Sequence, residues 1–168
     1  DIIKRHNIRF AQAIEDLSFY LLSNLCSEYS YNSLSSITKI KSSHTIEKYL
    51  GYLEESFIFF SLKRFSYKLK EQIFSIKKIY CIDNGFIHAK AFSSIQNFGK
   101  LYENLVAICL KKQELDGKIN FYYFKNNQQE EVDFVVREGT KTKQLIQVCY
   151  NLDDLDTKNR EIRALLKA

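Results

Sequence analysis

The sequence predicts an α/β protein of the α+β kind, with two regions that differ in the order of their elements. Helical spacing of apolar residues dominates roughly the first third, and two β-prone runs follow it. The second half reads as a helix, three strands and a helix. We expect one domain at residues 1–90 and a second, cut short at its C-terminus, at residues 91–168.

Three helices are expected at the start of the chain. The first spans residues 11–26, where apolar side chains recur at helical spacing, and the second lies around 32–37. The third follows Ser42 or Ser43, because a serine hydroxyl can accept a hydrogen bond from one of the amide groups that a helix start leaves free. In this third helix the apolar positions i, i+3, i+4 and i+7 are Ile46, Tyr49, Leu50 and Leu53.

Two β-prone runs, residues 57–62 and 79–82, come next and are joined by the segment 63–78, called the basic segment here. Three helices followed by two strands are the order of a winged helix. In that fold the third helix would enter a DNA groove with His44 and Lys48 on its outer side. A packing or partner-docking role for this helix is the alternative.

The basic segment carries a charge surplus equal to that of the whole chain, which is +5. Aromatic residues lie among its cations, a combination that suits phosphate neutralisation and base stacking. The alternative is a solvated hairpin whose aromatic side chains pack inward. The cations, opposed by Glu71 alone, are Lys63, Arg64, Lys68, Lys70, Lys77 and Lys78.

The second region is expected to form a small sheet between two helices. A helix with Glu103 precedes a strand at 120–124, a hairpin of strands 131–137 and 143–150, and a helix at 157–167. Glu103, Asp133 and Gln147 stand in the order of an oxygen-ligand set for Mg²⁺ or Mn²⁺, with the two acids as the metal ligands. A phosphodiesterase also needs a lysine, and Cys149 stands in its place; Lys143 or Lys158 could substitute for it.

Five ordered motifs carry a family resemblance. Together they resemble the C-terminal region of a large family of prokaryotic AAA-type ATPases. The resemblance implies a winged helix, then a domain of unknown function with a PD-(D/E)xK, restriction-endonuclease-like mixed sheet, and an ATPase domain on the N-terminal side as a partner. It assigns Glu103, Asp133, Gln147 and Cys149 to the catalytic pattern, the last two as departures from it. The motifs lie at residues 57–66, 79–85, 99–106, 131–135 and 146–150.

We therefore expect a nucleic-acid-associated binding or regulatory region of an AAA-type ATPase, with DNA as its partner and a degenerate nuclease-like site. An active divalent-metal nuclease and a protein-docking or oligomerisation module are the alternatives. The loss of one carboxylate and of the lysine favours binding over hydrolysis. The sequence leaves the oligomeric state and the choice between DNA and RNA open.

Other classes find no support in the sequence. No G-x-x-x-x-G-K-[ST] loop for ATP is present, and no apolar stretch approaches the roughly 18 to 20 residues that cross a membrane. The four cysteines lie far apart inside apolar runs, so buried free thiols in a cytoplasmic protein are expected. Because the chain starts without Met and stops within a helical pattern, we expect a fragment of a longer protein.

Overall fold

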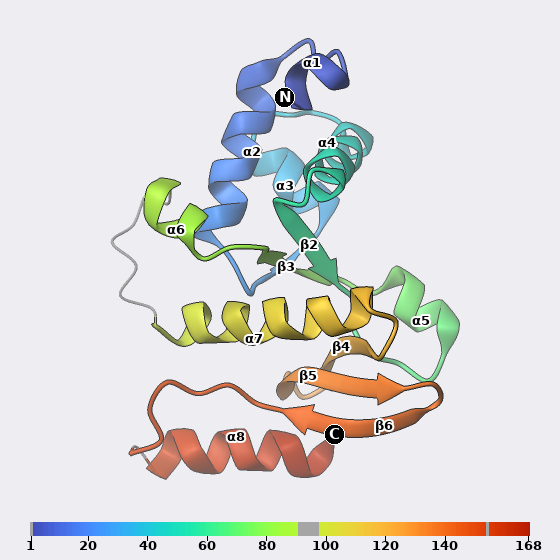
Figure 1. The fold of residues 1–168 in the computed structure, drawn as a ribbon, viewed down its shortest axis with the longest axis vertical. Helices are drawn as coiled ribbons and strands as arrows, with labels where there is room; N and C mark the ends of the chain where they lie inside the picture. The colour runs from blue at the N-terminus through green and yellow to red at the C-terminus, as the bar shows by residue number, and fades with distance from the viewer. Residues whose placement is uncertain (1, 91–97, 154) are drawn as a thin grey trace. The chain divides into compact units, whose positions relative to one another are not determined.

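The computed structural model describes residues 2–90, 98–153 and 155–168. It is an α+β structure, as the sequence predicts, with helices and two antiparallel sheets (Figure 1). The chain forms two compact units. Unit 1 contains residues 1–61 and 77–96, and unit 2 contains residues 62–76 and 97–168.

Unit 1 is mostly helical, with a small three-stranded sheet in the order β1-β3-β2. Strands β1 and β3 are antiparallel, with Glu28 opposite Lys78 and Tyr29 opposite Lys77. The elements are α1 (Ile2–Arg5), α2 (Ala11–Ser23), β1 (Glu28–Tyr29), α3 (Tyr31–Ile37), α4 (Ser43–Glu55), β2 (Phe59–Leu62), β3 (Lys77–Cys81) and α6 (Gly85–Lys90).

Local sequence explains the helix starts of unit 1. The Ser42 hydroxyl accepts a hydrogen bond from the backbone N–H of Thr45 at 3.4 Å, which caps α4, and Ser30 caps α3 through Ser33 at 3.2 Å. The predicted apolar stripe of α4 is confirmed, because its four members are all buried. The expected turn after β3 leads directly into α6, which the sequence pattern did not indicate.

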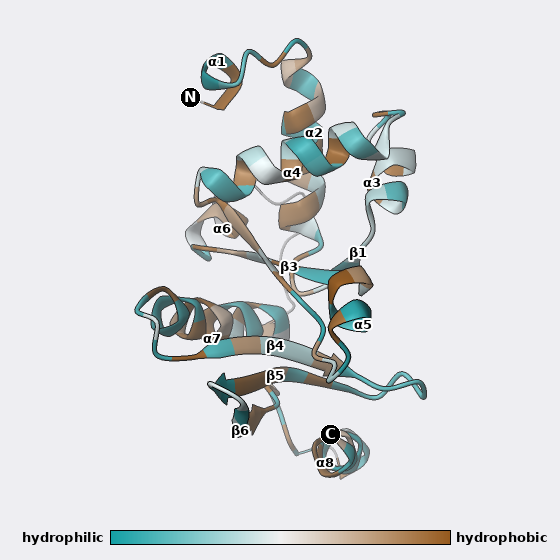
Figure 2. Cartoon of the chain, turned by 90° about the vertical axis from the view of Figure 1, so that its right-hand side faces the viewer, coloured by the Kyte–Doolittle hydropathy of each residue, from teal (hydrophilic) through white to brown (hydrophobic). Residues whose placement is uncertain are grey.

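Unit 2 contains a three-stranded antiparallel sheet in the order β4-β5-β6, with α7 contacting β4 and α8 contacting β5. The central strand β5 is buried over most of its length and appears largely brown in Figure 2. Phe134 is fully buried and contacts Phe121 across the sheet. The elements are α5 (Leu69–Phe74), α7 (Phe98–Leu115), β4 (Asn120–Lys125), β5 (Glu131–Glu138), β6 (Lys141–Ile146) and α8 (Leu155–Lys167).

Two expectations about elements of unit 2 are wrong. The last strand ends at Ile146 and does not reach residue 150, so Gln147 and Cys149 lie beyond it and share no strand face with Lys143. The basic segment is not a simple hairpin either, because it contains the short helix α5.

Backbone hydrogen bonds attach the start of the basic segment to the edge of β4. Tyr123 accepts from the N–H of Phe65 at 2.6 Å and donates to the carbonyl of Lys63 at 3.1 Å, which forms a parallel bridge between Arg64 and Tyr123. The hydroxyl of Tyr123, a fully buried residue, donates to the carbonyl of Ile76 at 2.5 Å. The basic segment thus covers a strand edge that would otherwise present unpaired amides.

Among the described residues no helix has the length and apolar character needed to cross a membrane. The expectation of four buried thiols is only half correct. Cys26 and Cys81 are buried, and burial raises the pKa of the Cys81 thiol, whereas Cys109 is exposed and Cys149 is half-buried.

Candidate functional site

The nuclease-like residues occupy three places in unit 2. Glu103 lies half-buried on α7, and Asp133 lies on β5 with only 6% of its surface exposed. Gln147 follows the end of β6. The fold brings Asp133 and Gln147 together, whereas convergence of Glu103 with them stays a prediction.

A hydrogen-bonded set of side chains, the Gln147 network, joins Asp133, Gln147 and Glu161 of α8. The Gln147 Oε1 atom accepts from the backbone N–H of Asp133 at 3.1 Å, and its Nε2 atom donates to Glu161 Oε2 at 2.6 Å. The Asp133 carboxylate accepts from the backbone N–H of Val148 at 2.8 Å. Gln147 therefore connects the sheet to α8 and turns both ends of its amide toward protein groups.

This geometry does not fit a divalent-metal centre. Mg²⁺ requires several oxygen ligands around one point, and the Gln147 oxygen already uses one of its two lone pairs to accept a backbone N–H. In the part of the chain that the structure describes, no three His, Cys, Asp or Glu side chains gather closely enough to hold a metal ion.

Cys149 stands at the position that the family resemblance gives to a lysine, and its side chain carries no ammonium group. The Cys149 thiol donates to the carbonyl of Asn151 at 3.0 Å. Lys143, a candidate replacement, pairs with Glu138 at 2.9 Å near the β5–β6 turn. Lys158, the other candidate, is exposed on α8.

The cations of the basic segment differ in their exposure. Lys63, Lys68 and Lys70 are exposed and Arg64 is half-buried. Lys78 is only 2% exposed, because it lies on the buried strand β3. The expectation that Lys78 belongs to the exposed nucleic-acid-binding cations is therefore wrong. Lys77 is half-buried and donates to the Tyr31 hydroxyl at 3.5 Å.

Glu71 is held by its neighbours. Its carboxylate accepts from Lys68 Nζ and from the Ser66 hydroxyl, both at 2.9 Å. The hydrogen bond from Lys68 lowers the pKa of Glu71, and the same bond raises the pKa of Lys68. Glu71 therefore offsets part of the positive charge of the segment.

The aromatic residues of the basic segment differ in their exposure. Phe65 is buried, and the guanidinium of Arg137 lies 5.1 Å from its ring centroid. Tyr67 is 88% exposed and Phe74 is 78% exposed.

Part of the basic segment lines an open groove of about 650 Å³ in unit 2, called the basic groove here. The end of β4 and the loop after it form the other side. The lining comprises Arg64–Lys68, Glu71, Phe74, Ser75, Phe124–Asn127 and Ala168.

The outer face of α4 carries both positive and negative groups. His44 lies 3.8 Å from Glu47, and the Lys48 ammonium lies 5.9 Å from the centre of the Tyr52 ring. The His6 ring stacks on Tyr52 at 3.6 Å, so the N-terminal segment covers part of this face. Besides Lys48, α4 carries three carboxylates, those of Glu47, Glu54 and Glu55.

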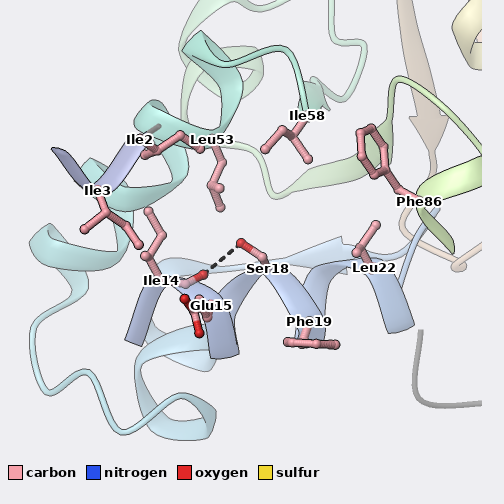
Figure 3. A pocket seen from close by; sticks show the side chains of 10 residues that line it. All are labelled: Ile2, Ile3, Ile14, Glu15, Ser18, Phe19, Leu22, Leu53, Ile58 and Phe86. Carbon is pink, nitrogen blue, oxygen red and sulfur yellow. Dashed lines mark hydrogen bonds between the residues drawn. The ribbon is translucent and has the colours of Figure 1, made fainter. Parts of the chain in front are cut away.

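Unit 1 also contains an apolar groove of about 450 Å³ (Figure 3). Phe19 of α2 and Phe86 of α6 line it and are about two-fifths exposed, at 40% and 42%. Its polar lining residues are few, and Ser18 donates its hydroxyl hydrogen to the carbonyl of Ile14 at 2.8 Å. The lining comprises Ile2, Ile3, Ile14, Glu15, Ser18, Phe19, Leu22, Leu53, Ile58 and Phe86.

Sequence reasoning missed two contributors to these sites. Glu161 carries no signal in the sequence, since a glutamate on a helix with many charged residues is usually solvated. The Asn126–Gln129 loop could have been noticed as a run of four amides before the strand at 131.

A family model described as a domain of unknown function (DUF8612) matches residues 1–97. The chain belongs to the DUF8612 family. A second model, also described as a domain of unknown function (DUF4143), matches residues 98–167 of this DUF8612 chain.

The curated relatives of the DUF8612 chain are themselves uncharacterised. It is similar to the uncharacterized protein MJ1544 of Methanocaldococcus jannaschii, with 35% identity over 100% of this chain and 37% of the relative. It is also similar to an uncharacterized protein of Haemophilus influenzae, with 25% identity over 92% of this chain and 38% of the relative. The chain thus spans less than two-fifths of the length of either relative. No solved structure matches it.

Proposed function

We propose that this chain is a nucleic-acid-binding region of an AAA-type ATPase, and that its nuclease-like site serves structure and not hydrolysis. The observation that carries the proposal is the basic groove, where cations and two highly exposed aromatic rings lie on a segment fixed to the edge of β4. Cations neutralise phosphates and release counterions, which makes binding favourable and salt-dependent.

The ATPase part of the proposal is supported by the motif resemblance and by the greater length of the relatives, of which this chain spans 37% and 38%. Membership of DUF8612 and the match to DUF4143 leave the activity open. The proposal concerns the region contained in this chain, and it assigns the N-terminal ATPase domain as an intramolecular partner.

Charge reversal tests the nucleic-acid part of the proposal. The triple variant Lys63→Glu, Lys68→Glu, Lys70→Glu changes three exposed lysines of the basic segment. We expect fluorescence anisotropy with labelled oligonucleotides to show at least a tenfold loss of affinity at about 50 mM salt. The slope of log K against log salt should also become shallower, because each lost phosphate contact contributes about 0.7 to 0.9 to it.

A matched control separates the basic segment from net charge. The variant Lys112→Glu, Lys118→Glu, Lys141→Glu makes the same charge change at three exposed lysines outside the basic segment. It should retain affinity within about threefold, since distant exposed charges are largely screened at this salt. Equal losses in both variants, or the absence of any binding by the wild-type chain at low salt, would refute the proposal.

Protein docking is the second candidate, and the apolar groove of unit 1 favours it. Exposed apolar surface of this kind marks many protein contacts. The variant Phe19→Glu, Phe86→Glu places two charges on the rim of this groove. If self-association seen by sedimentation disappears in this variant while oligonucleotide binding was never present, docking replaces nucleic-acid binding as the function.

A further inference from the structure

The two segments that line the basic groove differ in the chemistry of their side chains as well as in charge. One side carries Arg64, Lys68 and the rings of Tyr67 and Phe74, and the other carries the start of an amide-rich loop. The inference drawn from this combination rests on the proposed function and concerns the form of nucleic acid, single-stranded or double-stranded, that the groove fits.

The rings of Tyr67 and Phe74 are presented to solvent, and the Tyr67 ring contacts a buried ring. The Tyr67 ring meets the buried Phe65 ring edge-on, with centroids 4.9 Å apart and planes at 74°. Phe65 is in turn attached to β4 by its backbone hydrogen bond to Tyr123 and packs near Tyr122 at 5.8 Å. A large exposed ring fixed in this way offers a flat face for stacking.

The opposite side is a structured loop and not a loose connection. The Asn126 side chain accepts from the backbone N–H groups of Gln128 and Glu130 at 2.9 and 3.0 Å, and its amide nitrogen donates to the Glu130 carboxylate at 2.7 Å. Asn126 therefore fixes the turn, and the exposed Asn127 lines the groove from this turn. Figure 2 shows the hydrophilic colouring of this loop.

Charge in the groove is positive but modest. Three cationic residues, Arg64, Lys68 and Lys125, line it with one carboxylate, that of Glu71. Lys68 pairs with Glu71, and Lys125 lies 3.7 Å from Glu131. Such a groove attracts phosphates without the dense cation array that a duplex backbone requires on both of its strands.

The exposed faces of Tyr67 and Phe74 favour single strands over double strands. Bases inside a duplex already stack on each other, so exposed rings gain nothing from them, whereas unpaired bases can stack on aromatic side chains irrespective of sequence. A side-chain amide can donate to and accept from the exposed edges of unpaired bases. The volume, about 650 Å³, lies within the roughly 300 to 1,000 Å³ of sites that hold small organic molecules.

We propose that the basic groove binds single-stranded nucleic acid, with bases stacked on Tyr67 and Phe74, phosphates beside Arg64 and Lys68, and base edges facing Asn127. This assigns the nucleic-acid contact to unit 2 and gives it a preference for unpaired over paired strands. The preference does not depend on the ATPase or on hydrolysis.

The test compares a labelled 12-nucleotide thymidine oligomer with a hairpin duplex of the same total length at equal salt, using the whole 168-residue chain. The wild-type chain should bind the single strand at least tenfold more tightly than the duplex. The variant Tyr67→Ala, Phe74→Ala should lose roughly tenfold or more for the single strand and less than threefold for the duplex, since each stacked base contributes substantially to affinity.

Three controls make the outcomes distinct. Phe10→Ala removes another highly exposed ring, outside the groove, and should leave both affinities unchanged. Tyr67→Phe keeps a stacking face and should keep single-strand binding. Circular dichroism and thermal unfolding verify that each variant folds.

Each result decides between the two proposals. A duplex bound as tightly as the single strand, or equal losses for both forms in the double alanine variant, refutes the single-strand inference. If the lysine triple variant still loses binding in that case, the proposed function stands. Failure of the wild-type chain to bind either form refutes both.

Discussion

The nuclease-like site and the basic groove lie in the same unit, yet their side chains have different surroundings. In the first, the amide of Gln147 is occupied by Asp133 and Glu161. In the second, Tyr67 and Phe74 present most of their surface to solvent. The difference indicates that side chains of this unit are bonded within the protein at one place and exposed to solvent at the other.

The comparison also bears on the chemistry that the sequence pattern suggested. A catalytic site keeps ligands free for metal and substrate, and therefore tolerates side chains that lack protein partners. The Gln147 network does the opposite, because its hydrogen bonds connect β5, the chain after β6, and α8. Partly buried polar groups that are hydrogen-bonded in this way stabilise a fold and specify its packing.

The largest expected effect comes from removing the Tyr123 side chain, which holds the end of the basic segment. Tyr123→Ala deletes a fully buried ring and its hydrogen bond to Ile76. We expect a loss of about 3 to 5 kcal/mol in the free energy of unfolding, measured by urea denaturation. Oligonucleotide affinity should fall as well, because the end of the basic segment loses its side-chain contact, although the backbone hydrogen bonds of Tyr123 to Lys63 and Phe65 remain.

Tyr123→Phe separates the two contributions. It keeps the ring but leaves the Ile76 carbonyl without the hydroxyl donor, for an expected cost of about 1 to 3 kcal/mol. A variant as stable as the wild type would show that this bond does not hold the segment in place.

The second effect comes from restoring an acid to the nuclease-like site. Gln147→Glu recreates the residue that a nuclease needs there, but it replaces a donor 2.6 Å from the Glu161 carboxylate with a second carboxylate. The expected cost is about 1 to 3 kcal/mol in thermal or urea unfolding at neutral pH.

Acidification provides the check on this variant. The deficit should shrink as the pH falls toward about 4, because protonation of either carboxyl restores a donor and removes the repulsion. The double variant Gln147→Glu, Glu161→Gln should recover much of the stability. A Gln147→Glu chain of wild-type stability would contradict the structural role of the network.

Much of the fold could be predicted because local rules determine it. The capped starts of α3 and α4 follow from Ser30 and Ser42, and the apolar stripe of α4 follows from its spacing. Helix α5 escaped prediction because it has no side-chain cap and buries none of its residues, so it leaves no periodic pattern of burial.

The sites were less predictable because distant residues decide them. Gln147 lies beyond the end of the strand and is hydrogen-bonded to Asp133 and Glu161, each fourteen positions away along the chain. Lys78 lies in a buried strand although lysine is almost always exposed. The split between the buried Phe65 and the exposed Tyr67 likewise depends on β4, which no local pattern encodes.

A smaller effect is expected from removing the carboxylate of the basic groove. Glu71→Gln releases Lys68 and raises the positive charge of the lining. Single-strand affinity should rise about two- to fivefold at low salt, and the slope against log salt should steepen by about 0.7 to 0.9 if Lys68 then meets a phosphate. An unchanged slope would show that Lys68 does not contact the backbone.

The charge state of Glu71 sets the pH range of that measurement. Its pKa is lowered, chiefly by the hydrogen bond from Lys68, so the carboxylate stays charged from neutral pH to below its ordinary pKa. The ion pair is thus fully present above the ordinary pKa and is lost only as the pH falls through the lowered value. Between about pH 5 and 8, the wild-type affinity should not change through this group.

The smallest expected effect is that of divalent ions on the nuclease-like site. A metal bound at about 100 times its Kd would stabilise the chain by about 2.7 kcal/mol, which corresponds to a rise in Tm of roughly 5 to 10 °C. Because Gln147 is turned toward protein groups and no metal-binding cluster exists among the described residues, 10 mM Mg²⁺ or Mn²⁺ (~100 times a typical Kd) should move Tm by less than about 1 °C. A shift of several degrees that vanishes in Asp133→Asn would instead place an ion at this site and reopen hydrolysis.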